Sequence, residues 1–154
     1  MKKSCGIIIL NQYNEILMGH STGNSFFDIP KGGMEDGEEP IDSAIRECIE
    51  ESSLIFNKEN LVDLGEFSYN KEKRIHLFIT FVIKENILLN ELKCETYFEH
   101  FYTKKLVPEI DSFSWIEASE ESLDNKCAKS MARVLKNLLN SNQLLKPLTL
   151  KKSF

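Results

Sequence analysis

The sequence lacks several features that would mark a membrane, nucleic-acid or repeat protein. It contains no run of about 18 apolar residues, the length that a membrane-spanning helix needs. It has no excess of positive charge, since 19 Lys and Arg against 24 Asp and Glu give a net charge of −5. This balance argues against a general nucleic-acid or membrane-surface binder. No internal repeat or low-complexity segment is visible, which excludes a solenoid.

Cysteine pairs at metal-binding or redox spacing are also missing. The four cysteines are Cys5, Cys48, Cys94 and Cys127, with no CxxC pair among them. This spacing favours reduced structural thiols over a disulfide framework or a zinc site. The N-terminal run MKKSCGIIIL ends too early for a signal peptide. We therefore expect a cytoplasmic protein.

The 154 residues suit one domain that buries a real core. We predict a single domain over residues 1–140 and a C-terminal tail over 141–154, whose order and role the sequence does not indicate. Apolar patterning predicts strands at residues 4–10, 15–19, 26–29, 61–69, 75–83 and 113–116. It predicts an amphipathic helix over 120–140 and leaves 84–108 unassigned. The fold class is α/β, with a sheet between helices.

The most informative stretch is residues 27–54, FDIPKGGMEDGEEPIDSAIRECIEESSL. Pro40 suits the first turn of a helix, because its missing N–H costs nothing there. An apolar stripe then recurs at i, i+3, i+4 and i+7, formed by Ile41, Ala44, Ile45 and Cys48. We predict a helix that places this stripe against the core.

The other side of this helix is acidic. Glu47, Glu50 and Glu51 stand at i, i+3 and i+4, so three carboxylates share one face. Arg46 can pair with only one of them, Glu50, at i,i+4. A hard divalent cation would relieve the repulsion, because Mg²⁺ prefers oxygen ligands and is usually held by one or two carboxylates and substrate phosphates. A solvated acidic face is the alternative for an isolated run of this kind.

The surrounding spacing decides between these alternatives. Gly32, x5, Glu38, x7, Arg46-Glu47-Cys48, x, Glu50-Glu51, x, Ser53-Leu54 resembles the Nudix box, with every charged position in place. Cys48 replaces the usual aliphatic residue, a mild change because a buried thiol behaves as a small hydrophobe. Ser53 replaces the glycine that closes the helix. At a left-handed C-cap a non-glycine residue costs on the order of 1 kcal/mol.

The resemblance implies an α/β/α sandwich with a mixed β-sheet. It also implies a hydrolase that cleaves the pyrophosphate bond of a nucleoside diphosphate linked to another group, with Mg²⁺, or alternatively Mn²⁺, as cofactor. In this interpretation Glu47, Glu50 and Glu51 bind the metal, and one of them can instead orient or deprotonate the water. Gly32 is structural, and Glu38 and Arg46 form an ion pair that aims the ligands.

Several residues outside the box are candidates for the site. Glu109, in an acidic loop before the last expected strand, is a candidate metal ligand or base, with Glu95 and Glu99 as weaker choices. Lys31 is expected either to meet a phosphate or to be a solvated loop lysine. The aromatic candidates for base stacking are Phe26, Phe27 and Tyr69, with core packing favoured for the two phenylalanines.

The substrate is less well defined by the sequence. Tyr69 lies sixteen residues after Ser53, a spacing similar to that of dinucleoside polyphosphate hydrolases, and Pro30-Lys31-Gly32 points the same way. Sanitising of nucleoside triphosphates and RNA 5′-pyrophosphate removal are alternatives, although the acidic charge gives no sign of an RNA groove. A non-catalytic nucleotide-binding module would be expected to lose box carboxylates, and an acidic scaffold would make the spacing accidental. Homodimers are frequent among relatives, but the sequence leaves the oligomeric state open.

Overall fold

The computed structural model describes residues 2–144 and contains a seven-stranded mixed sheet, a separate two-stranded hairpin and three α-helices. The strands of the main sheet are β1 (Lys2–Asn11), β2 (Glu15–Ser21), β3 (Phe27–Asp28), β4 (Lys31–Gly33), β5 (Val62–Asn70), β6 (Lys73–Val82) and β9 (Ile110–Glu117). The hairpin pairs β7 (Tyr97–Glu99) with β8 (Leu106–Pro108). The helices are α1 (Pro40–Ser52), α2 (Glu120–Lys126) and α3 (Lys129–Asn140), and short 3-10 turns cover Lys58–Asn60, Lys84–Asn86 and Leu89–Glu91.

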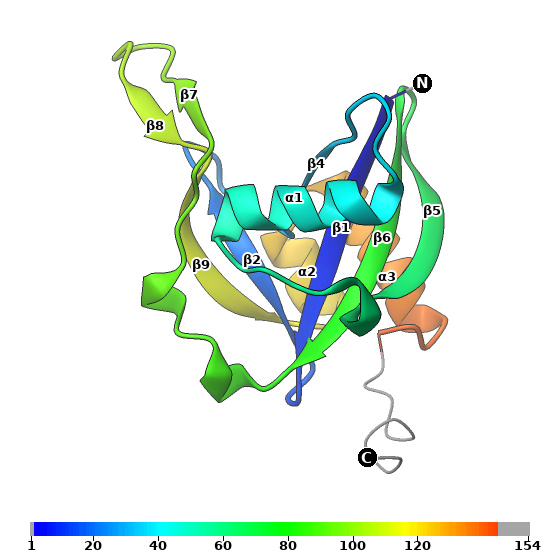
Figure 1. Cartoon of the computed structure of the whole chain (residues 1–154). Helices are drawn as coiled ribbons and strands as arrows, with labels where there is room; N and C mark the ends of the chain where they lie inside the picture. Colours follow the sequence, from blue (N-terminus) through cyan, green and yellow to red (C-terminus); the bar gives the residue numbers. More distant parts are fainter. Residues whose placement is uncertain (1, 145–154) are drawn as a thin grey trace.

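Strand β1 is at the centre of the main sheet. It runs parallel to β6 from Lys2↔Lys73 to Asn11↔Val82, while β2 and β4 pair with it in antiparallel orientation. The path continues as β3-β2-β1-β6-β5, and β9 pairs with β2. Figure 1 shows α1 lying across one face of the sheet, with α2 and α3 on the other face.

The two faces of β1 form two separate cores. Ile7 and Ile9 pack with Ala44 and Cys48 of α1, whereas Ile8 and Leu10 pack in the cluster that includes the buried residues of α2 and α3. This division follows from the strand repeat of two, which sends successive side chains to opposite faces. The α/β/α sandwich with a mixed sheet is confirmed.

The predicted helix over 120–140 is wrong in one respect, because the chain leaves the helical conformation at Cys127 (φ −103°, ψ 156°). Cys127 forms an isolated parallel β-bridge with Phe27, and its thiol packs against Met18. In the sequence, Cys127 nevertheless lies four residues from both Leu123 and Met131, so its spacing continues the apolar face of the predicted helix. A contact with a distant strand therefore overrides the local helical pattern and separates α2 from α3.

Other boundaries also differ from the predictions. The last strand begins at Ile110 rather than Phe113, because it pairs with β2 along its length. The predicted strands leave residues 70–74 as the turn before β6. The observed turn contains only Lys71 and Glu72, because β5 and β6 remain paired as far as Asn70↔Lys73. Residues 84–108 form two 3-10 turns and the β7–β8 hairpin.

All four cysteines are free and buried. The predicted tail begins at residue 141, and its first residues are packed, because Leu144 is 1% exposed in the core that includes α3. The rest of the predicted tail, residues 145–154, lies outside the described residues. None of the helices within residues 2–144 has the length and apolarity needed to cross a membrane.

Candidate active site

Helix α1 begins and ends as its sequence suggests. Pro40 occupies the first turn, where no N–H is required. At the other end Ser53 is left-handed (φ 66°, ψ 6°), and its N–H donates to the carbonyl of Ile49. The serine therefore stands at a position that favours glycine.

Of the predicted apolar stripe, Ala44 and Cys48 are buried and Ile41 packs partly buried against the same core, whereas Ile45 is only partly buried and belongs to neither core cluster. The acidic face of α1 lies beside β4.

The contact between β4 and α1 fixes two of the three carboxylates. A Cβ added at Gly32 would overlap the carboxylate of Glu47, so only glycine leaves room for it. The backbone N–H of Lys31 donates to Glu51 Oε1 at 2.9 Å. Strand β4 is itself held by antiparallel pairing with β1, including Cys5↔Gly32. The central strand thus positions both carboxylates through β4.

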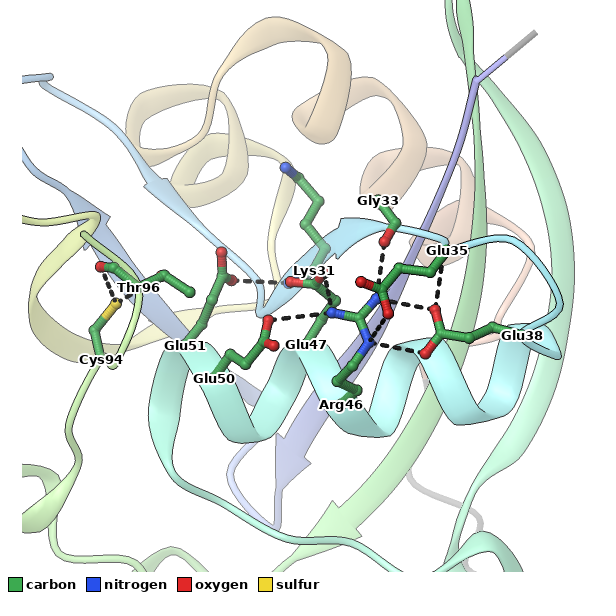
Figure 2. A network of polar contacts seen from close by, with 10 residues as sticks. All are labelled: Lys31, Gly33, Glu35, Glu38, Arg46, Glu47, Glu50, Glu51, Cys94 and Thr96. Atoms are coloured by element: carbon green, nitrogen blue, oxygen red, sulfur yellow. Dashed lines mark hydrogen bonds and ion pairs between the residues drawn. The ribbon is translucent and has the colours of Figure 1, made fainter. Parts of the chain in front are cut away.

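Arg46 connects the acidic loop to the helix (Figure 2). Its guanidinium donates to Glu38 from Nε at 2.8 Å and from Nη2 at 3.0 Å, a bidentate pair. Nη1 donates to Glu47 Oε1 at 2.9 Å and to Glu50 Oε2 at 3.2 Å, and Nη2 also reaches the carbonyl of Gly33. Hydrogen bonds from one cation therefore hold three glutamates and the end of β4 in fixed relative positions, and Glu35 adds a longer ion pair at 3.6 Å.

The electrostatic environment differs among these carboxylates. Burial raises the pKa of Glu51 to about 8, although the Lys31 N–H acts in the opposite direction. Burial also raises the pKa of Glu47, where Arg46 opposes the shift and the charges of Glu50 and Glu109 add to it. The hydrogen bonds from Arg46 lower the pKa of Glu38 to about 2. The carboxylates of Glu47 and Glu51 therefore lie in surroundings that disfavour their ionised form.

A pocket of about 360 Å³ opens beside this face and brings three of the predicted charged residues together. Glu51, Lys31 and Glu109 all line it, although they come from α1, β4 and the junction of β8 and β9. Glu95 and Glu99 do not line it. Glu95 instead donates its backbone N–H to the carbonyl of Glu50 at 2.6 Å.

The Lys31 side chain lies in a buried pair with Asp28. Its Nζ is 3.1 Å from Asp28 Oδ2, with side chains 20% and 16% exposed. Burial acts to lower the pKa of Lys31, but Asp28, Tyr69 and Glu51 outweigh it and raise the pKa. The Tyr69 ring lies 5.8 Å from Nζ and packs against the core, outside the pocket lining. Tyr69 therefore lies next to Lys31, which itself lines the pocket.

The pocket also contains residues that were not predicted. Asp28 lines it and was missed, although its place three residues before Lys31 was a usable signal. Phe98 lines it from β7, and no local pattern indicated that hairpin. Of the two phenylalanine candidates, Phe26 lines the pocket and Phe27 packs against the core.

The donor set suits a hard divalent cation. The described residues contain no group of three His, Cys, Asp or Glu side chains already arranged around one metal position. The prediction that Arg46 pairs with Glu50 alone is wrong, because its guanidinium bridges Glu47 and Glu50 and places a positive charge between these two carboxylates. Carboxylate oxygens, with Glu51 on the same face, are the ligands that Mg²⁺ prefers. The residues present therefore fit such an ion.

Comparisons with known proteins agree with this geometry. A family model described as NUDIX domain matches residues 2–138. An uncharacterised 17.7 kDa protein of Enterobacteria phage T4, from the e-segB intergenic region, is 32% identical over 144 residues, covering 88% of this chain and 93% of its own. An RNA pyrophosphohydrolase of Yersinia pestis is 28% identical over 123 residues, covering 75% of this chain and 69% of its own.

The fold is also found among solved structures. The crystal structure of an Ap4A hydrolase from C. elegans, in a binary complex, superposes with a TM-score of 0.60. The match covers 94% of this chain and all of that one, with 18% sequence identity. An identity this low supports the shared fold alone.

Proposed function

This chain belongs to the Nudix family of pyrophosphate-bond hydrolases, and we propose that it cleaves a nucleoside diphosphate linked to a second nucleoside, with Mg²⁺ as cofactor and Mn²⁺ as an alternative. Enzymes of this family generally use a divalent metal. In the proposal one domain over residues 1–140 carries the whole site. Family membership does not identify the substrate, so the dinucleoside polyphosphate is part of the proposal.

The observation that carries the proposal is the meeting of the acidic face with the pocket. Glu51 belongs to both, because it stands on the carboxylate face of α1 and lines the pocket with Lys31 and Glu109. A polyphosphate in the pocket would therefore lie next to the residues proposed to hold the cation. Substrate phosphates commonly complete a magnesium site of this kind.

Each residue has a distinct role in the proposed reaction. Glu47, Glu50 and Glu51 hold the cation, which when bound neutralises phosphate oxygens and lowers the pKa of water. Arg46, fixed by Glu38, keeps Glu47 and Glu50 in place. Gly32 leaves space for the Glu47 carboxylate.

The proton of the attacking water requires an acceptor within the pocket. Glu109 is the proposed base, because it lines the pocket and its exposed carboxylate can release the proton to solvent. Its backbone is held on both sides: its N–H donates to the carbonyl of Thr96 at 2.8 Å, and its carbonyl accepts from the Thr22 N–H at 3.0 Å. A box glutamate is the alternative base.

Lys31 is proposed to contact a phosphate in the pocket. Its amine is paired with Asp28, and both side chains line the pocket. Tyr69 packs beside this pair, so it would act on the substrate through the position of Lys31. Phe26, on the pocket wall, offers an aromatic face for a base.

One alternative substrate has a specific observation in its favour. The Yersinia pestis relative is named an RNA pyrophosphohydrolase, and it is 28% identical over 123 residues. Removal of pyrophosphate from an RNA 5′ end breaks the same kind of bond and uses the same catalytic groups. The two substrates differ in where the second nucleoside is attached: through the polyphosphate chain in a dinucleoside polyphosphate, and to the 3′ oxygen of the first nucleoside in RNA.

A substrate panel tests the proposal. The panel contains diadenosine tetraphosphate, ADP-ribose, normal and oxidised dNTPs and 5′-triphosphorylated RNA, each assayed with Mg²⁺ and with EDTA, with products resolved by chromatography. We expect metal-dependent cleavage that favours the dinucleoside. A preference for triphosphorylated RNA would select the alternative substrate.

Two variants separate catalysis from binding. Glu50→Gln and Glu51→Gln are expected to abolish turnover while unfolding remains cooperative, because each change removes a charged ligand and keeps the side-chain shape. Wild-type activity in both variants would overturn the metal assignment. Absence of turnover in the wild type, with nucleotide binding retained, would show a non-catalytic module instead.

A further inference from the structure

The β7–β8 hairpin exposes an unusual amount of aromatic surface. It projects from the body of the protein near the C-terminal end of α1 (Figure 1). Four of the five exposed aromatic side chains within the described residues lie on it: Tyr97, Phe98, Phe101 and Tyr102. Phe101 and Tyr102, at its tip, are 74% and 84% exposed. Clustered exposed apolar surface of this kind marks an interaction site.

The tip is also basic, in a chain whose net charge is −5. Lys104 and Lys105 follow the aromatic pair, and Lys104 Nζ lies 5.1 Å from the Phe101 ring centroid. Phe101 and Tyr102 meet edge to face, with centroids 5.0 Å apart. Aromatic faces interleaved with positive charge are the combination that binds unpaired nucleotides, since bases stack on the rings and phosphates lie near the charges.

The hairpin is continuous with the pocket. Phe98 of β7 lines the pocket, and Glu109 follows β8 directly. Phe101 is three residues beyond Phe98, which corresponds to at most about 10 Å of extended chain. The tip is therefore close enough to the pocket to be contacted by the rest of a ligand whose phosphates occupy the pocket.

We propose that the tip of this hairpin binds the second nucleoside of the substrate, by stacking on Phe101 and Tyr102 with Lys104 and Lys105 near its phosphate. The proposal rests on the proposed function, because it assumes that the pocket holds the cleaved pyrophosphate. The second nucleoside has two sources, the distal half of a dinucleoside polyphosphate or the second nucleotide of an RNA 5′ end. The chemistry recognised is the same in both.

Two matched substrate pairs test the proposal. Diadenosine tetraphosphate is compared with adenosine tetraphosphate, and a 5′-triphosphorylated RNA dinucleotide that begins with adenosine is compared with adenosine 5′-triphosphate 3′-monophosphate, so that within each pair only the second nucleoside differs. For each pair we define the ratio as kcat/KM for the substrate with two nucleosides divided by kcat/KM for the substrate with one. This ratio is measured in the wild type and in the Phe101→Ala/Tyr102→Ala double variant. We expect the ratio to fall about tenfold in one pair, equal to about 1.4 kcal/mol. The pair that responds identifies the source.

Three control variants isolate the effect. Tyr13→Ala removes the other exposed aromatic side chain, which lies in the β1–β2 turn, and is expected to leave both ratios unchanged. Phe101→Tyr/Tyr102→Phe retains two aromatic faces and is expected to keep the wild-type ratio. Lys104→Gln/Lys105→Gln is expected to lower the ratio less than the loss of both rings does, because the stacking faces remain.

A binding measurement makes the result independent of turnover. In the Glu50→Gln background, calorimetry is expected to show tighter binding of the substrate with two nucleosides, and the hairpin double variant is expected to lose that advantage. Unchanged ratios and unchanged affinities in the double variant would overturn the proposal while leaving the proposed function intact. A change only in sedimentation behaviour would also overturn it, because the hairpin would then contact a second copy. Failure of the proposed function would instead appear as no wild-type cleavage of any substrate.

Discussion

The carboxylate of Glu47 lies over the backbone of Gly32, at the place where a side chain at position 32 would begin. Strand β4 and helix α1 therefore approach each other closely at the residue proposed to bind the cation. The close approach of β4 and α1 requires glycine at position 32. A side chain there would displace only the carboxylate end of the flexible Glu47 side chain. A substitution at this position is expected to affect the site more than the fold.

Gly32→Ala tests this relationship. The new methyl group must push the Glu47 carboxylate aside, and misplacement of a reacting group by about 1 Å can cost about 100-fold in rate. We expect turnover to fall by at least about tenfold, with a loss of less than about 1 kcal/mol in the free energy of unfolding. Steady-state assays and urea unfolding measure the two quantities.

Gly33→Ala is the matched control. No atom lies within 4 Å of a Cβ added at Gly33, the next residue of the same strand. Its activity is expected to stay within about twofold of wild type. Equal losses in both variants would mean that a side chain at either glycine of β4 disturbs the site, and the specific role of Gly32 would be refuted.

Ser53 offers a prediction about stability alone. It caps α1 in the left-handed conformation, which costs a non-glycine residue about 1 kcal/mol. Ser53→Gly removes this cost but loses the hydroxyl, which accepts from the Lys93 N–H at 3.3 Å and donates to the carbonyl of Ser52. We expect a net gain of about 0.5–1 kcal/mol in the free energy of unfolding, read from urea denaturation. Ser53→Ala, which keeps the strained backbone and loses the hydroxyl, should be less stable than wild type.

The ionisation of Glu15, a residue outside the pocket lining, leads to a prediction about how stability depends on pH. Burial tends to raise its pKa, but hydrogen bonds from Lys84 and Asn11, both at 2.9 Å, lower it overall. Because the folded pKa lies below the unfolded value, the ionised form contributes stability above the unfolded pKa. That contribution is lost as the pH falls through the folded pKa.

Glu15→Gln should therefore be less stable than wild type at pH 7, by up to about 1 kcal/mol because the pair is partly exposed. The difference should shrink as the pH falls from about 5 toward 3. Urea unfolding midpoints across this range measure it, with Glu59→Gln, at an exposed site, as control. A difference that stays constant with pH would contradict the assigned ionisation.

The sequence predicted the parts of the site that are local. Glu47, Glu50 and Glu51 share a face because they belong to one helix, and helix geometry follows from spacing. The pocket was less predictable, since Glu109 meets Glu51 only because β9 crosses to pair with β2. Phe98 depends on a hairpin that no local pattern indicated. The break at Cys127 arises from a tertiary contact with Phe27, which the helical spacing of the sequence conceals.

The measurement that tests the central claim most directly is Mn²⁺ binding followed by electron paramagnetic resonance. It reports on the carboxylate face without relying on turnover. We predict that Mn²⁺ binds the wild type, that Mg²⁺ competes for the same site, and that Glu50→Gln and Glu51→Gln each weaken binding by at least about tenfold. Glu121→Gln, in the first turn of α2, should bind as the wild type does. Equal Mn²⁺ affinity in the wild type and in both variants of the face would contradict the metal assignment.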